Sequence, residues 1–460
     1  MRISDCHTLL SATSALLLAG CAISAQQRPG HALIRSIDSV ARAALRAGPI
    51  AGMSVALVRG SDVLLAKGYG YADLENSVPA TQHTVYRIAS ITKQFTAAAI
   101  LQLAEQGQLN LDDDIRRYLP SYDTQSYTIT IRQLLNHTSG IRSFTELPAF
   151  QARDRLDLPA ESLLAIFQHE PLDFPPGAGF RYNNSAFYLL GLIIERVSRQ
   201  PYGEYLRGHV LAPLGLRETY SCRDAPIIRH RARGYRLSGG KLQNAQYLSM
   251  EPPTAGGSLC STVLDLVTWT RALAEGRLIT HASYLQMTTP GTLPDGITLG
   301  YGHGLFVSTL GGHREIVHGG DINGFSAYKA YYPDDSLTLV ILSNTEGPLV
   351  SSGQIPRAIA RRALGVPEER PKELPLSTRD RARFTGVYRA GTARVAVTEE
   401  RGQITLTEPF PAAYLYQGGD VFVCDKSAEI RALFSGRGAR ADRLILELGG
   451  QRLFDLTRAP

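Results

Sequence analysis

The chain has 460 residues, of which 44% are hydrophobic and 20% charged, and its formal net charge is +6. This length corresponds to about three domains, and the composition excludes a disordered, collagen-like or low-complexity protein. Basic residues alternate with acidic ones, as at residues 368–370 and 380–381, rather than collecting on one stripe. Nucleic acid is therefore not expected as a partner.

The first 25 residues have the pattern of a secretory signal peptide. Arg2 precedes an apolar stretch at residues 9–18, which is shorter than the roughly 20 residues that a membrane-spanning helix needs. Leu-Ala-Gly-Cys at residues 18–21 resembles the signal of bacterial lipoproteins, in which Cys21 becomes the acylated first residue, whereas Ala-Ile-Ser-Ala at residues 22–25 suits an ordinary signal peptidase. We expect an exported bacterial protein, either periplasmic or anchored to a membrane through lipidated Cys21.

The cysteines contain no Cys-x-x-Cys pair that would favour metal or redox chemistry. Beyond residue 21 only Cys222, Cys260 and Cys424 remain. A bridge between Cys222 and Cys260 is compatible with an oxidising compartment, but their spacing alone does not establish it.

The hydrophobic pattern changes character along the chain. Two β-prone runs at residues 53–58 and 63–68 predict a hairpin. Apolar periodicity then predicts helices at residues 94–106, 131–135, 186–196 and 262–275. Short strands follow at residues 305–307, 315–317, 326–332 and 337–342. Strands at both ends with helices between them predict one sheet closed by distant parts of the chain, carrying a helical insertion.

A second, smaller domain is predicted at the C-terminal end. Residues 366–375 are rich in proline and charge, the composition of a stiff linker. Beyond it, alternating runs predict an all-β barrel or sandwich, with strands at residues 394–397, 403–406, 421–423, 430–434, 443–448 and 452–456. We therefore divide the chain into a signal peptide at 1–25, a main domain at 31–365, a linker at 366–375 and a small all-β domain at 376–460.

Ser90 and Lys93 lie where a β-like segment enters the helix predicted at residues 94–106. Residues three apart on a helix share a face, so the Lys93 amine can reach the Ser90 hydroxyl as a base beside a nucleophile. The same Ser-x-x-Lys spacing begins at Ser238, in a Gly-rich loop, and at Ser326, on a predicted strand where positions three apart point to opposite faces. Taken alone, this spacing favours the alternative, in which Ser90 is a helix cap and Lys93 faces solvent.

Tyr182 and Asn184 form a Tyr-x-Asn motif before the helix predicted at residues 186–196. A phenol can act as a base if a neighbouring ammonium lowers its pKa, and an amide can bind both a substrate carbonyl and a lysine. The alternative is a turn in which Asn184 or Ser185 caps the helix.

His318 and Gly320 form a His-x-Gly motif at the end of a predicted strand. The glycine allows a substrate to lie close to the backbone, and the histidine offers it a hydrogen bond or a charge. A histidine beside a glycine turn without function is the alternative. No histidine spacing suits zinc, so neither a metal nor another cofactor is expected.

These three motifs occur in the order found in class C β-lactamase-like serine hydrolases. The segments at residues 134–140 and 319–325 resemble the same family, and the likeness spans about residues 36–364. It implies an α/β fold of the β-lactamase/D,D-peptidase type, a mixed antiparallel sheet with flanking helices and a helical subdomain, with the site between them.

The resemblance also implies a role for each motif residue. Ser90 would be the acylated nucleophile, Lys93 its base, and Tyr182 the group that relays a proton to the leaving group. Asn184 would orient the substrate and Lys93. The backbone N–H groups of Ser90 and Asp321 would hold the oxyanion.

The third motif departs from that of true class C β-lactamases, which have Lys-Thr-Gly where this chain has His-Gly-Gly. The His-x-Gly form resembles D-aminopeptidases, D-Ala carboxypeptidases and related esterases. We therefore expect hydrolysis of a small-molecule or peptide substrate through an amide, peptide or ester bond. A weak β-lactamase or penicillin-binding protein, and a non-catalytic envelope binding protein on the same fold, remain alternatives. The oligomeric state is not predicted.

Overall fold

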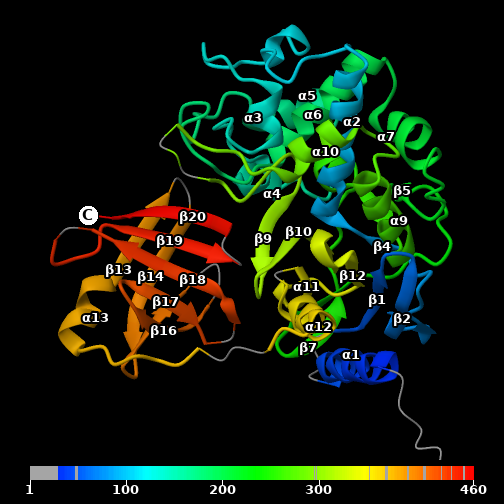
Figure 1. Cartoon of the computed structure of the whole chain (residues 1–460). Helices are drawn as coiled ribbons and strands as arrows, with labels where there is room; N and C mark the ends of the chain where they lie inside the picture. The colour runs from blue at the N-terminus through cyan, green and yellow to red at the C-terminus, as the bar shows by residue number, and fades with distance from the viewer. Residues whose placement is uncertain are drawn as a thin grey trace, which may run out of the picture.

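The computed structural model describes residues 29–459 except 47–49, 295, 297, 352, 368–370, 391–392, 408–410, 426, 437 and 449–450. The predicted signal at 1–25, with Cys21, lies outside the described residues. Figure 1 shows a larger part built from a sheet and helices, with a β-barrel beside it.

A seven-stranded antiparallel sheet forms the centre of the larger part, in the order β3-β2-β1-β12-β11-β10-β9. Its N-terminal hairpin pairs with the C-terminal strand β12, as in the pairing of Val55 with Ile341. The sheet is therefore closed by distant parts of the chain, as predicted. The strands are β1 (Gly52–Arg59), β2 (Asp62–Asp73), β3 (Val78–Pro79), β9 (Phe306–Leu310), β10 (His313–Ile322), β11 (Phe325–Tyr332) and β12 (Leu337–Ser343).

Both faces of the central strands are buried because helices cover each side. Along β1, Met53, Val55 and Leu57 pack in one hydrophobic core, whereas Ala56 and Val58 pack in another. The first core is closed by α1 (Pro29–Arg46), α11 (Pro348–Ser351) and α12 (Gln354–Leu364). The second core contains α2 (Thr92–Glu105) and α9 (Val263–Ala274). This alternation places α2 directly against the sheet.

The remaining helices of the larger part form a layer around α2. They are α3 (Ile131–Leu135), α4 (Pro148–Gln151), α5 (Ala160–Phe167), α6 (Asn184–Ser198), α7 (Tyr202–Leu206), α8 (Thr254–Gly257) and α10 (His281–Thr288). In the upper half of Figure 1, α3, α5 and α6 lie on one side of α2 and α7 lies on the other. Short 3-10 turns are η1 (Ala89–Ile91), η2 (Ile115–Arg117), η3 (Phe144–Glu146) and η5 (Pro333–Asp335), and η4 (Arg207–Leu211) is a π-helical turn.

Two small sheets connect this layer to the main sheet. One has the order β4-β8-β5, from β4 (Tyr86–Arg87), β8 (Leu259–Ser261) and β5 (Tyr220–Ser221), and the other pairs β6 (Tyr235–Ser238) with β7 (Lys241–Asn244). A disulfide joins Cys222 to Cys260, the bridge that the sequence left open. Strand β4 leads directly into η1 and α2.

The C-terminal part is a closed eight-stranded antiparallel barrel preceded by helix α13 (Thr378–Phe384). Side chains such as Phe384, Tyr388 and Tyr414 fill its interior, and β20 contacts the edge strand β9. The predicted fold class is confirmed, although the helix α13 was not expected. The strands are β13 (Gly386–Ala390), β14 (Ala393–Glu400), β15 (Gln403–Leu406), β16 (Ala412–Gly418), β17 (Val421–Cys424), β18 (Ser427–Ser435), β19 (Arg443–Leu448) and β20 (Gln451–Arg458).

Candidate active site

Ser90 lies in η1, at the entrance to the buried helix α2. The residue before it, Ala89, has a φ of 47°, a left-handed conformation that costs free energy for a non-glycine residue. This bend turns the chain from β4 into α2, and the Ser90 side chain stays partly exposed.

Lys93 is 0% exposed, and its Nζ donates hydrogen bonds to three oxygens. These are Ser90 Oγ at 3.2 Å, Asn184 Oδ1 at 2.8 Å and the carbonyl of Gly256 at 2.8 Å. None of these acceptors is a carboxylate, so burial lowers the pKa of the amine to about 7. A large share of Lys93 is therefore neutral near pH 7 and able to take a proton from Ser90.

Asn184 is held in one orientation by groups on both sides of its amide. Its Oδ1 accepts from Lys93, and its Nδ2 donates to Thr145 Oγ1 at 3.0 Å. The cap of α6 is Asn183, whose side chain accepts from the backbone N–H of Ala186. The expectation that Asn184 or Ser185 would cap this helix is wrong, and Asn184 is left free to bind Lys93.

Thr145 is a site residue that the sequence analysis missed. It belongs to η3, and the same turn is anchored by Ser143, whose Oγ accepts from the backbone N–H of Asn184 at 3.1 Å. No motif marks this segment, because the contact joins residues 39 apart through tertiary packing.

Tyr182 lies over the Lys93 amine, with Nζ 4.8 Å from the centroid of its ring. Its hydroxyl is buried and makes no hydrogen bond of normal geometry among the described residues. Burial raises the pKa of the phenol, and the neighbouring Ser90 side chain only partly opposes this rise. Tyr182 therefore remains protonated, contrary to the expectation that an ammonium would lower its pKa, and it can donate a proton.

His137 packs against the Tyr182 ring, with the ring centroids 4.4 Å apart. Its Nδ1 accepts from the backbone N–H of Asn183 at 3.1 Å, so the proton of the neutral imidazole is on Nε2. Burial lowers the pKa of His137 well below its usual value. This imidazole is therefore a neutral packing group of the site.

His318 on β10 is 2% exposed and uses both ring nitrogens within the protein. Its Nδ1–H donates to the carbonyl of Gly319 at 2.5 Å, and its Nε2 accepts from the Tyr301 hydroxyl at 3.2 Å. Burial and the nearby Lys93 amine lower the pKa of the imidazole to about 3. The structure therefore provides no cation at this position, and Tyr301 is a second partner that the sequence analysis missed.

Gly320 brings β10 against the backbone of η1. A Cβ placed there would lie 2.4 Å from the carbonyl oxygen of Ile88 and 3.2 Å from the backbone nitrogen of Ser90, distances that only glycine tolerates. The motif glycine thus allows close approach of strand and nucleophile.

The edge of β10 that carries Asp321 is not covered by β9, whose pairing ends at Val317 with Phe306. Val307 donates its N–H to Gly300 instead of β10, so Phe306 and Val317 exchange the ladder hydrogen bonds. Because N–H groups alternate along a strand, the N–H of Asp321 points to the same edge of β10 as that of Val317, away from β11.

The other two Ser-x-x-Lys pairs do not form such a site. Ser326 Oγ donates to the carbonyl of Thr345, whereas Lys329 Nζ donates to Gln94 Oε1. The pair beginning at Ser238 lies in the partly exposed β6–β7 hairpin. Among the described residues no group of three His, Cys, Asp or Glu side chains is placed to hold a metal ion.

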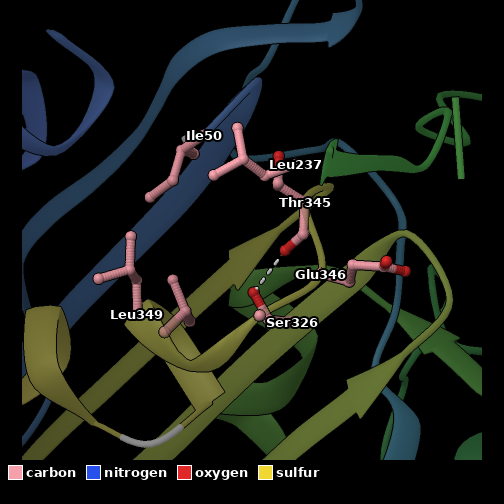
Figure 2. A pocket seen from close by; sticks show the side chains of 8 residues that line it. Ile50, Leu237, Ser326, Thr345, Glu346 and Leu349 are labelled. Atoms are coloured by element: carbon pink, nitrogen blue, oxygen red, sulfur yellow. Dashed lines mark hydrogen bonds between the residues drawn. The ribbon is translucent and has the colours of Figure 1, made fainter. Parts of the chain in front are cut away.

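A cavity of about 330 Å³ lies beside the β10–β11 hairpin. Figure 2 shows Ile50, Leu237 and Leu349 around this space, with the Glu346 carboxylate turned away from them. Gly347 also lines it, and its backbone N–H donates to Asp321 Oδ1 at 3.3 Å. A hydrogen bond thus links Gly347 of the cavity wall to Asp321, a predicted site residue.

None of the described helices is long and apolar enough to cross a bilayer. The predicted lipid anchor is a separate matter, because Cys21 lies outside the described residues.

Several known proteins are similar to this chain. Protein flp of Staphylococcus aureus (strain MRSA252) is 31% identical over 328 residues, covering 69% of this chain and 64% of that protein, so this chain spans just under two thirds of its length. Penicillin-binding protein 4* of Bacillus subtilis (strain 168) is 30% identical over 390 residues, covering 78% and 86%. The structure of a D-stereospecific amidohydrolase from Streptomyces sp. matches with 29% identity and a TM-score of 0.62, covering 72% and 98%.

The family model described as Beta-lactamase matches residues 37–364. This segment contains the main sheet, the helical layer and all the motif residues described above. The chain therefore belongs to the beta-lactamase family of serine hydrolase folds.

Proposed function

We propose that the protein is an exported serine hydrolase that forms an acyl-enzyme on Ser90 with an amide, peptide or ester substrate. The observation that carries this proposal is the 3.2 Å contact between Lys93 Nζ and Ser90 Oγ. It is supported by the burial of that amine without a carboxylate partner, which lowers its pKa to about 7.

In the proposed reaction, Lys93 takes the proton of Ser90 as Oγ attacks the substrate carbonyl carbon. The backbone N–H groups of Ser90 and Asp321 stabilise the oxyanion. The bond to the leaving group breaks as Tyr182, still protonated, supplies a proton to it, and the Lys93 ammonium returns the proton taken from Ser90 to the Tyr182 oxygen. Water then attacks the ester on Ser90, its hydroxyl joins the acyl group, and its proton restores the serine.

The proposed substrate is an amide or peptide of a D-amino acid, since the similar Streptomyces protein is a D-stereospecific amidohydrolase. The neutral state of His318 supports this choice. A site for a β-lactam carboxylate needs a lasting positive charge, and His318 does not offer one. Penicillin binding is the second candidate, favoured by the likeness to penicillin-binding protein 4*.

The test combines covalent labelling with a substrate panel. A fluorophosphonate or penicillin probe should add its mass to the peptide containing Ser90, and D-amino-acid amides should be hydrolysed faster than short esters or nitrocefin. Ser90→Ala should abolish labelling and turnover, whereas Ser238→Ala, which removes the matching serine of another Ser-x-x-Lys pair, should leave both unchanged. Labelling that persists in Ser90→Ala would refute the assignment, and substrate binding without turnover would favour the non-catalytic alternative.

Export and lipidation at Cys21 are part of the proposal and have a separate test. The mature protein made in a bacterial host should partition into the detergent phase, and Cys21→Ser should move it to the aqueous phase. If both proteins partition equally, Cys21 does not carry the anchor, and cleavage by an ordinary signal peptidase remains as the way the signal peptide is removed.

A further inference from the structure

The loop between β5 and β6 presents an apolar tip to solvent. Ala225, Pro226 and Ile227 are exposed. Ile227 is 99% exposed, the largest value for a large hydrophobic side chain among the described residues. Most of its apolar surface is therefore in contact with water when the protein is alone.

The loop is fastened at several points, so the tip is not free to fold back. The disulfide at Cys222 holds its start. Arg231 Nη2 donates to the carbonyl of Pro226 at 3.1 Å, inside the loop. Arg87 Nη2 donates to Asp224 Oδ1 at 3.1 Å, which ties the loop to strand β4. Ile227 is thus presented on a rigid support.

Charged side chains of both signs lie around this tip, and the basic ones are in excess. Arg223 pairs with Glu251 at 3.2 Å, and Asp224 is neutralised by Arg87. No ion pair is found for Arg229 within the described part of the chain, and it is exposed. The surface beside Ile227 therefore carries uncompensated positive charge.

A hollow of about 790 Å³ lies behind the tip. Leu211, Leu216 and Ile228 give it an apolar wall, and two arginines also line it: Arg207, which is paired with Glu204 of the same hollow, and Arg217, for which no ion pair is found among the described residues. Its size, its aliphatic wall and the Arg217 cation suit a molecule with an apolar body and an anionic head.

We propose that this loop, residues 223–231, binds the surface of an anionic phospholipid bilayer, with Ile227 inserted among the acyl chains and the arginines at the phosphates. An apolar side chain flanked by basic ones is the pattern of interfacial membrane binding. One such contact is weak and reversible, and the predicted acyl group on Cys21 would supply a second anchor. This proposal is independent of the hydrolytic reaction, because Ile227 contacts none of the site residues described above.

The test uses the chain from residue 22 onward, which holds every described residue and lacks the predicted lipidation site at Cys21. It is sedimented with vesicles of phosphatidylglycerol and phosphatidylcholine, and with vesicles of phosphatidylcholine alone. Binding is expected only to the anionic vesicles and should weaken as salt is added. Ile227→Ser and Arg229→Glu should each lower the partition coefficient about tenfold. Leu285→Ser, which removes a 45% exposed leucine of α10, is the matched control and should bind normally.

Fluorescence gives a second, local measurement. The native chain has a single tryptophan, Trp269, which is fully buried against Phe95. In Ile227→Trp, anionic vesicles should therefore shift the emission of the new side chain to the blue. Absence of vesicle binding, unchanged binding of Ile227→Ser, or an unshifted spectrum would each overturn the proposal. Self-association in solution that Ile227→Ser abolishes, without vesicle binding, would assign the loop to a second copy of the chain and overturn it as well.

Discussion

Replacing Gly320 by alanine should slow acylation of Ser90 by about two orders of magnitude. The new Cβ would lie 2.4 Å from the carbonyl oxygen of Ile88, where ordinary contact begins at 3.4 Å. That atom belongs to backbone, so β10 and η1 would have to separate by about 1 Å. The backbone donor of Asp321 lies one residue further along β10 and would move with the strand. A displacement of about 1 Å in a catalytic constellation typically costs about 100-fold in rate.

The assay is the second-order rate of fluorophosphonate labelling of Ser90, with kcat and KM on a hydrolysed amide measured beside it. The loss should appear mainly in kcat, because the displaced donors act on the transition state. Gly208→Ala is the control, since a Cβ there meets no atom within 4 Å. Labelling of Gly320→Ala within about threefold of wild type, at a temperature well below its Tm, would refute the reasoning from close approach.

Three further predictions follow from buried polar groups of the site and its surroundings. Thr145→Val removes the acceptor of the Asn184 amide and should lower kcat/KM about tenfold, the value of one hydrogen bond, whereas Thr145→Ser should restore it. The acylation rate should rise with pH around an apparent pKa near 7, because only the neutral Lys93 amine accepts a proton; a rate that is flat between pH 5.5 and 9 would count against this base. The fully buried Lys329 also has its pKa lowered to about 7 by burial, so the unfolded state binds more protons and stability rises as pH increases from about 7 toward 10.5. Lys329→Met should raise the free energy of unfolding at pH 7 by about 1–3 kcal/mol and flatten this slope in urea titrations at several pH values, and a loss of stability would contradict the argument.

Much of the fold could be predicted because its signals are local. The helix predicted at residues 94–106 corresponds to α2 (Thr92–Glu105), and the strand predicted at 326–332 corresponds to β11 (Phe325–Tyr332). In both, a run of suitable side chains is bounded by turn residues, so neighbours in sequence carry the information. Helix α1 was missed although its signal is also local: Leu33, Ile37, Val40 and Ala44 recur at helical spacing and form the face that packs in the core beside α12.

The site was predicted only in part. Ser90 and Lys93 are brought into contact by helical spacing, and this signal lies within a segment of four residues. Asn184, which binds Lys93, was marked by its motif. The groups that hold Asn184 and His318 could not be found in the same way, because Thr145 and Tyr301 belong to segments without a motif. The protonation states were also out of reach, since His318 is neutral through burial that composition does not reveal.

The sequence alone specifies the order of the three motifs and the alternation of apolar and polar residues along the strands of this protein. Helix spacing and strand periodicity act between near neighbours in the chain. Only the tertiary structure decided which oxygens surround the Lys93 amine, that Tyr182 stays protonated, and that Ile227 stands in solvent on a rigid loop. The physical reason is that desolvation and contact across long chain separations depend on every element packed around a group.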